Sequence, residues 1–361
     1  MNDNLFSNTV GSTDFISAIG LQMLPSVFGK LLSSNIEDEE DDALIQCIPT
    51  ETTYSERKLY YNFFKYLWQG RYDVLEVGPF LGGTTRSIAL GMSKNIMDKK
   101  SAKLHTIDKF ENYNIKLLER VLDLKLFNEN KREKLLNKLN NDSDFESIFD
   151  ELHADCQYNN IINKIKGGLP DIPNDRNHID LYDVLKGVKL ECVFVDGCKS
   201  WYSTKYLLKY ISYALVDNGY LIFQDYGWYT CFWIPFIISK LNSKLTLIAS
   251  VDTTYIFKIT DTVKENDFEA IPNDPNELEK IDIESTFEKL LYDSTKRNDY
   301  NYLVIGRIHL AGALAYCGYK LESKKLLQSL LLETFAADFR DVIKNALVSP
   351  TYSPENGEIL L

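Results

Sequence analysis

The sequence predicts an α/β fold: a mostly parallel β-sheet with helices on both of its faces. Short β-rich runs alternate with helical segments along the middle of the chain, a pattern typical of parallel sheets. These runs lie at 72–78, 103–107, 190–195 and 220–223. Two further β-rich runs, 245–251 and 253–260, are separated only by Asp252, and so short a link predicts an antiparallel hairpin. We therefore expect a parallel sheet that finishes with an antiparallel strand.

The composition predicts a folded, acidic protein. The chain has 361 residues, of which 45% are hydrophobic, and a formal net charge of −12. Such a charge repels phosphate backbones and anionic lipids, so we expect neither nucleic acid nor a membrane as partner. Six scattered cysteines without a CxxC pair suit reduced thiols. No stretch has the pattern of a signal peptide or a membrane span, which favours a cytoplasmic protein.

Four parts are expected along the chain. Residues 1–52 form an N-terminal helical cap and acidic linker, in which the run EDEEDD at 37–42 is interpreted as a solvated loop. Residues 53–262 carry the sheet, with a helical insertion at about 113–165. A proline-containing linker at 263–282 leads to a C-terminal lobe at 283–361, predicted to be all-helical. One helix pair there is similar to a tetratricopeptide unit, which predicts packing on the main domain or a homo-oligomer contact.

A glycine-rich turn is the strongest local signal. The run DVLEVGPFLGGTT at 73–85 ends a predicted strand with Glu76 and then places Gly78 and Gly82 before a helix. Glycines let the main chain approach a ligand, and the N-terminus of a helix favours polar ligand groups. The dinucleotide fingerprint requires a second glycine two residues after the first, where this chain has Phe80. An NAD(P)-dependent oxidoreductase is therefore the disfavoured alternative.

Acidic residues end three later strands of the predicted sheet. Asp108, Asp196 and Asp225 each follow a β-rich run. Because open α/β sheets bind ligands at the carboxyl ends of their strands, we expect these carboxylates near a ligand. A carboxylate such as that of Asp108 offers two acceptor oxygens and no donor, which suits it to the hydroxyl groups of a ligand. Asp196 and Asp225 together could hold a divalent cation.

Taken in this order, the residues resemble class I S-adenosylmethionine-dependent methyltransferases over about residues 55–260. The resemblance implies a doubly wound, mostly parallel, seven-stranded Rossmann-like sheet with a terminal antiparallel strand. It implies that the turn KGGLPD at 166–171 approaches the adenine of the cofactor. It also implies that S-adenosyl-L-methionine is bound by Glu76, Gly78, Gly82, Asp108 and Asp196.

The spacing of Asp196 and Lys199 narrows the resemblance toward small-molecule O-methyltransferases of the catechol and macrolide-sugar kinds. These enzymes methylate a hydroxyl of a small molecule or glycan-type acceptor. The resemblance implies Lys199, Asp196 and Asp225 as catalytic residues, with Lys199 as the base and Asp196 and Asp225 as ligands of Mg²⁺. A metal ion would lower the pKa of Lys199. The third metal ligand of those families stands at the position of Tyr226, so metal-free methylation with Asp196 or Lys199 positioning the acceptor remains an equal alternative. A third alternative is that Lys199 is buried and simply paired with Asp196 or Asp225.

Two further questions stay open in the sequence. The aromatic residues that follow Asp225 could form an acceptor pocket or belong to the core: Tyr226, Trp228, Tyr229, Phe232 and Trp233. Among the four histidines, only His178 falls in a loop that could reach the site. An alternative from a different functional class is a non-catalytic binding or scaffold protein with the same fold. In such a protein the C-terminal lobe would carry the function.

Overall fold

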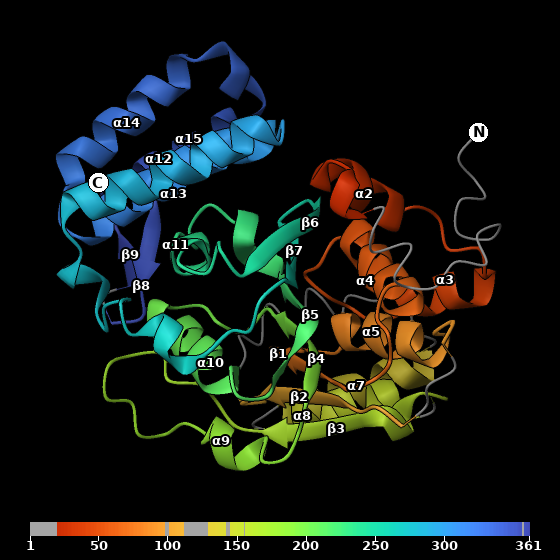
Figure 1. The fold of residues 1–361 in the computed structure, drawn as a ribbon. Helices are drawn as coiled ribbons and strands as arrows, with labels where there is room; N and C mark the ends of the chain where they lie inside the picture. The colour runs from red at the N-terminus through yellow and green to blue at the C-terminus, as the bar shows by residue number, and fades with distance from the viewer. Residues whose placement is uncertain (1–19, 98–100, 112–128, 142–144, 155, 356) are drawn as a thin grey trace.

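A seven-stranded mixed sheet forms the centre of the molecule (Figure 1). The structure is a computed structural model that describes residues 20–97, 101–111, 129–141, 145–154, 156–355 and 357–361. The strand order is β3-β2-β1-β4-β5-β7-β6, and β7 runs antiparallel to both of its neighbours. The predicted fold with its antiparallel strand is confirmed. The strands are β1 (Asp73–Val77), β2 (Leu104–Asp108), β3 (Ile162–Lys166), β4 (Leu190–Val195), β5 (Leu215–Phe223), β6 (Leu245–Val251) and β7 (Thr254–Ile259).

The register of the parallel strands brings their carboxyl ends to one edge. Val77 of β1 pairs with Ile107 of β2 and with Val195 of β4, which in turn pairs with Phe223 of β5. The residues that follow these strands therefore start at the same level. This edge carries the candidate site.

Alternate side chains of each strand enter two different cores, as expected for a sheet covered on both faces. One face packs against α10 (Trp201–Ile211) and α11 (Trp233–Ser239). The other packs against α2 (Pro25–Leu32), α4 (Tyr54–Tyr66) and α5 (Gly83–Ser93) (Figure 1). Leu75 and Val77 belong to the first core, whereas Val74 belongs to the second.

The acidic run at 37–42 is helical at its end, so its interpretation as a loop was wrong. Asp38 accepts hydrogen bonds from the main-chain nitrogens of Glu40 and Asp41 and thereby caps α3 (Glu39–Gln46). Acidic side chains in the first turn of a helix are stabilised by its dipole. Asp41 is buried and accepts a hydrogen bond of 2.6 Å from the hydroxyl of Tyr61.

The insertion predicted at about 113–165 extends too far. Part of it, 112–128, 142–144 and 155, lies outside the described residues. The described part contains α7 (Glu129–Asn141), α8 (Glu146–His153) and η1 (Asn159–Ile161), but its end is β3, the edge strand of the sheet. β3 pairs only with β2 and is polar, so it lacks the apolar run by which the other strands were recognised. A short helix, α9 (Leu181–Val184), then precedes β4.

The C-terminal lobe consists of helices and one small hairpin. Its helices are α12 (Lys280–Lys296), α13 (Tyr300–Tyr316), α14 (Lys320–Leu332) and α15 (Arg340–Val348). The segment before α12 contains two 3₁₀ turns, η3 (Glu265–Phe268) and η4 (Pro275–Glu277), and a third, η5 (Thr334–Phe339), precedes α15. The lobe ends in an antiparallel hairpin of β8 (Thr351–Ser353) and β9 (Gly357–Ile359), so the all-helical prediction was wrong. Strands of three residues are too short to show a periodicity.

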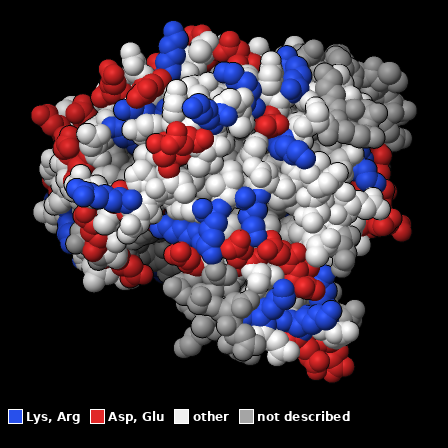
Figure 2. Space-filling view, turned by 90° about the horizontal axis from the view of Figure 1, so that it is seen from below, with Lys and Arg blue, Asp and Glu red and all other residues white. Residues whose placement is uncertain are grey.

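The lobe is packed on the main domain without a break in the core. Ile283 and Phe287 of α12 and Tyr302 of α13 belong to the same buried cluster as α10 and α11. All six cysteines are free, as predicted. Within the part of the chain that the structure describes, none of the helices is long and apolar enough to cross a bilayer. Figure 2 shows one face of the molecule, on which basic and acidic side chains are interspersed.

Candidate functional site

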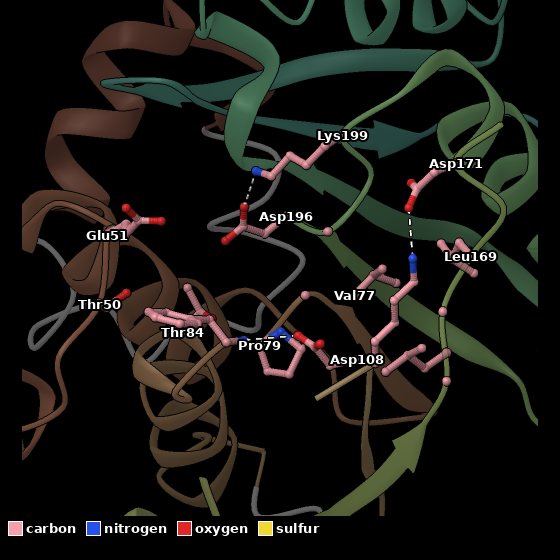
Figure 3. A pocket seen from close by; sticks show the side chains of 17 residues that line it. Thr50, Glu51, Val77, Pro79, Thr84, Asp108, Leu169, Asp171, Asp196 and Lys199 are labelled. Atoms are coloured by element: carbon pink, nitrogen blue, oxygen red, sulfur yellow. Dashed lines mark hydrogen bonds and ion pairs between the residues drawn. The ribbon is translucent and has the colours of Figure 1, made fainter. Parts of the chain in front are cut away.

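A cavity of about 260 Å³ opens at the carboxyl edge of the sheet (Figure 3). The ends of β1, β2 and β4 and the turn after β3 contribute to its lining, and Thr50 and Glu51 close it from the N-terminal side. Of the residues expected to bind a cofactor, Gly78, Asp108 and Asp196 line this cavity, as does Lys199. The turn at 166–171 contributes Gly167, Gly168, Leu169 and Asp171. The turn that the resemblance places near the adenine of the cofactor thus lies at this cavity, and its contact with the adenine stays a prediction.

Gly78 lies where the ends of the neighbouring parallel strands β1 and β4 come close together. Its φ is +83°, and a Cβ atom there would be 2.4 Å from the main-chain nitrogen of Gly197. The nitrogens of Asp196 and Gly197 donate to the carbonyl of Val77 at 2.9 and 2.8 Å. Only glycine satisfies both the positive φ and the close approach. These two hydrogen bonds hold the turn after β1 against the acidic end of β4.

Glu76 and Gly82 lie behind the turn and do not line the cavity. Gly82 caps α5 with a φ of +87°, and a Cβ there would be 2.0 Å from Nε2 of His153. Glu76 is fully buried, and each of its oxygens accepts a hydrogen bond of 2.7 Å from Thr84 or Thr85. Burial raises the pKa of Glu76 to about 8, against the effect of these two donors. The two residues fix the turn, and their contact with a cofactor, which the resemblance implies, stays a prediction.

Asp108 presents a partly satisfied carboxylate to the cavity (Figure 3). Its Oδ1 accepts from the nitrogen of Phe110 at 2.9 Å, and its Oδ2 accepts from the nitrogen of Phe80 at 3.4 Å. Burial raises the pKa of Asp108, and main-chain donors oppose this rise. The adjacent Lys109 forms an ion pair of 2.9 Å with Asp171, across the turn after β3. The long contact to Phe80 leaves acceptor capacity on Asp108 for a ligand hydroxyl.

Lys199 joins the other two acidic strand ends. Its Nζ lies 2.7 Å from Asp196 and also contacts Asp225, although the lysine side chain is 47% exposed. Burial would lower the pKa of Lys199, but the two carboxylates outweigh it and hold the pKa well above its ordinary value. Burial raises the pKa of Asp196 to about 6, despite the opposing effect of Lys199. The lysine expected to act as a base with a lowered pKa is thus a protonated bridge.

The three-residue cluster does not fit a magnesium ion as it stands. The ammonium group of Lys199 already occupies the position between the two carboxylates where a cation would bind. Tyr226, at the place of the third ligand, packs its ring against Tyr255 and Tyr302 at centroid distances of 4.5 and 5.5 Å. Among the described residues, no group of three or more His, Cys, Asp or Glu side chains could hold a metal ion.

The aromatic residues after Asp225 belong mainly to the core. Tyr226, Phe232 and Trp233 are buried, whereas Trp228 is 48% exposed and does not line the cavity. His178 is also absent from the cavity lining: its Nδ1 lies 2.9 Å from the carbonyl of Ile179.

Sequence reasoning did not identify Thr50, Glu51 and Lys109 as lining residues. Thr50 and Glu51 immediately precede a capping box in which Thr53 and Glu56 begin α4. The sequence spacing of that box, a threonine three residues before a glutamate, marks this end of the helix. It would not have shown that the helix begins beside the cavity.

Comparisons with known proteins give structural matches only. No protein-family model matches the sequence, and neither does any curated protein. The O-methyltransferase NovP matches with a TM-score of 0.39 and 14% identity, over 69% of this chain and 100% of that chain. The SAH-bound methyltransferase PaMTH1 of Podospora anserina matches with a TM-score of 0.33 and 14% identity, over 69% of this chain and 95% of that chain. This chain is therefore similar over part of its length to two methyltransferase structures, and its own strand order establishes a seven-stranded mixed α/β fold.

Proposed function

We propose that this protein is an S-adenosylmethionine-dependent methyltransferase that acts on a hydroxyl of a small molecule or glycan-type acceptor. The observation that carries the proposal is the convergence of Gly78, Asp108 and Asp196 in one cavity at the carboxyl edge of the sheet. Gly78 allows the close approach of a ligand to the main chain, and Asp108 offers acceptors for the hydroxyls of a ribose.

The charge of the cavity favours this cofactor over a dinucleotide. Its two lysines, Lys109 and Lys199, are each paired with an aspartate. Asp108 and Glu51 add further carboxylates to the lining. Such a lining attracts the cationic sulfonium of S-adenosylmethionine and disfavours the anionic pyrophosphate of NAD.

Asp196 is the residue best suited to accept the proton of the acceptor. It lines the cavity, and its pKa of about 6 lies close to neutral pH, where a general base is effective. Lys199 remains protonated beside it and stabilises its charged form. When bound, S-adenosylmethionine would supply a methyl group that is attached to its sulfonium. Once the methyl group is transferred, the sulfur remains as a neutral thioether. Asp196 would take the proton that the acceptor hydroxyl loses as its oxygen forms the new bond to carbon.

Calorimetric titration with S-adenosylhomocysteine, beside NAD and with and without Mg²⁺, tests the proposal. We expect S-adenosylhomocysteine to bind, NAD not to bind, and Mg²⁺ to leave the affinity unchanged. Asp108→Asn should weaken binding by at least about 10-fold, because it removes charge-assisted hydrogen bonds to the ribose.

Asp183→Asn is the matched control, since Asp183 is exposed on α9 and does not line the cavity. Its affinity should equal that of the wild type. Binding of NAD in place of S-adenosylhomocysteine would replace the proposal with the oxidoreductase alternative. If neither ligand binds, a non-catalytic scaffold protein would be favoured.

A further inference from the structure

The C-terminal hairpin reaches the cluster at the cavity. The hydroxyl of Tyr352, on β8, donates a hydrogen bond of 2.7 Å to the carbonyl of Lys199, 153 residues earlier in the chain. The ring of Tyr352 lies edge-on to Trp233 at a centroid distance of 5.4 Å. Its neighbour Thr351 donates a second hydrogen bond, of 2.8 Å, to the carbonyl of Thr230.

The main chain at Lys199 needs such an anchor because it lies in a short link. Asp196 ends β4, and Ser200 caps α10 through a capping box with Ser203. Between them, the nitrogen of Lys199 donates to Gly197 at 3.2 Å. The carbonyl of Lys199 points to the hairpin instead. Since almost half of the lysine side chain is exposed, packing alone does not determine where its ammonium group lies.

The lobe also holds the other side of the cluster. Nε2 of His309, on α13, donates a hydrogen bond of 2.8 Å to the carbonyl of Trp228. Trp228 directly follows η2 (Gln224–Gly227), the turn that carries Asp225. Two elements of the C-terminal lobe thus hold the segments that present Lys199 and Asp225.

We propose that Tyr352 is a positioning residue, which holds the carbonyl of Lys199 so that its ammonium group bridges Asp196 and Asp225. The C-terminal lobe then helps to set the geometry of the site. The inference rests on the proposed function only for its catalytic meaning, because the bridge itself can be measured without cofactor or acceptor.

Acylation of lysines by acetic anhydride, followed by peptide mass spectrometry, tests this role in the full chain. An amine reacts only in its neutral form, so the bridged Lys199 should react slowly relative to the exposed Lys186. Tyr352→Phe keeps the ring against Trp233 but removes the hydroxyl. We expect it to raise the ratio of Lys199 to Lys186 labelling by about three-fold or more, the range set by the loss of one hydrogen bond.

Two controls separate this role from a general loss of structure. Tyr206→Phe removes a hydrogen bond of the same kind, from a tyrosine hydroxyl to the carbonyl of Ile179 at 3.0 Å, and should leave the labelling ratio unchanged. Thr351→Val loosens the same hairpin without touching the hydroxyl of Tyr352, and should have a smaller effect.

An unchanged ratio in Tyr352→Phe would overturn the proposal, and so would an equal increase in Thr351→Val. Affinity for S-adenosylhomocysteine should be retained in Tyr352→Phe, because Tyr352 does not line the cavity; its loss would mean that the hairpin supports the whole site and not Lys199 in particular. If the wild type binds no S-adenosylhomocysteine, the proposed function fails while the labelling still reports on the bridge.

Discussion

Replacing Glu76 by glutamine should stabilise the protein at neutral pH. Glu76 is fully buried, and burial raises its pKa from an ordinary value of 4.5 to about 8. Between these two values the unfolded chain has lost the proton while the folded chain keeps it, so folding stability falls as the pH rises. Each pH unit costs about 1.4 kcal/mol, which gives a loss of about 3 kcal/mol by pH 7 and about 4 kcal/mol by pH 8, where the folded protein begins to lose the proton as well.

Glutamine removes this cost and keeps the hydrogen bonds. Its amide oxygen can accept from one of the hydroxyls of Thr84 and Thr85, and its amide nitrogen can donate to the other. Urea unfolding of both proteins at pH 5, 6, 7 and 8 provides the measurement. The difference between their free energies of unfolding isolates Glu76 from other titrating groups, and it should grow in favour of Glu76→Gln as the pH rises. A constant difference, or one that favours the wild type increasingly at high pH, would refute the assigned pKa.

Two further predictions concern the close approach of the main chains at the ends of β1 and β4, and the cluster of Asp196, Lys199 and Asp225. Gly78→Ala should lower the free energy of unfolding by more than about 3 kcal/mol, because its Cβ would be 2.4 Å from Gly197; Gly187→Ala, at a φ of +79° but with nothing within 4 Å, should cost only about 1 kcal/mol. Urea unfolding distinguishes them, and equal costs would contradict the steric argument. Asp225→Asn should bind S-adenosylhomocysteine like the wild type but lose methyl transfer to whichever acceptor the wild type methylates, since Asp225 contacts Lys199 without lining the cavity. Weakened binding in calorimetry would place Asp225 at the cofactor instead.

The sheet and its acidic edge could be predicted because both follow from local patterns. Buried strands appear as apolar runs, and Asp108, Asp196 and Asp225 each follow such a run. The position of Glu76 follows from the same alternation, which places it with Val74 on the face covered by α4 and α5. The two-residue period of the strand thus accounts for the absence of Glu76 from the lining of the cavity.

The pairing of Lys199 with Asp196 or Asp225 was one of the alternatives left open by the sequence, but the spacing to Asp196 could not decide between this pairing and a lysine base. Its protonation depends on Asp225, 26 residues later, and its main chain is held by Tyr352, 153 residues later. Such contacts depend on the tertiary packing of a lobe whose last strands are three residues long. The spacing of Asp196 and Lys199 therefore predicted that these two residues lie together. It did not predict that the lysine is protonated.

The packing of α2 on β6 affects the order in which the protein can fold. Thr53, beside the start of α4, donates a hydrogen bond to Asp252 in the β6–β7 link, 199 residues away in the chain, and Gly29 of α2 lies against the main chain of Ser250 in β6. During synthesis, α2 therefore emerges long before β6, the strand on which it packs. Contacts of such long sequence separation form slowly, because a large loop must close first. The apolar face of α2, with Phe28 and Leu32, therefore lacks this partner until residues 245–251 have been translated.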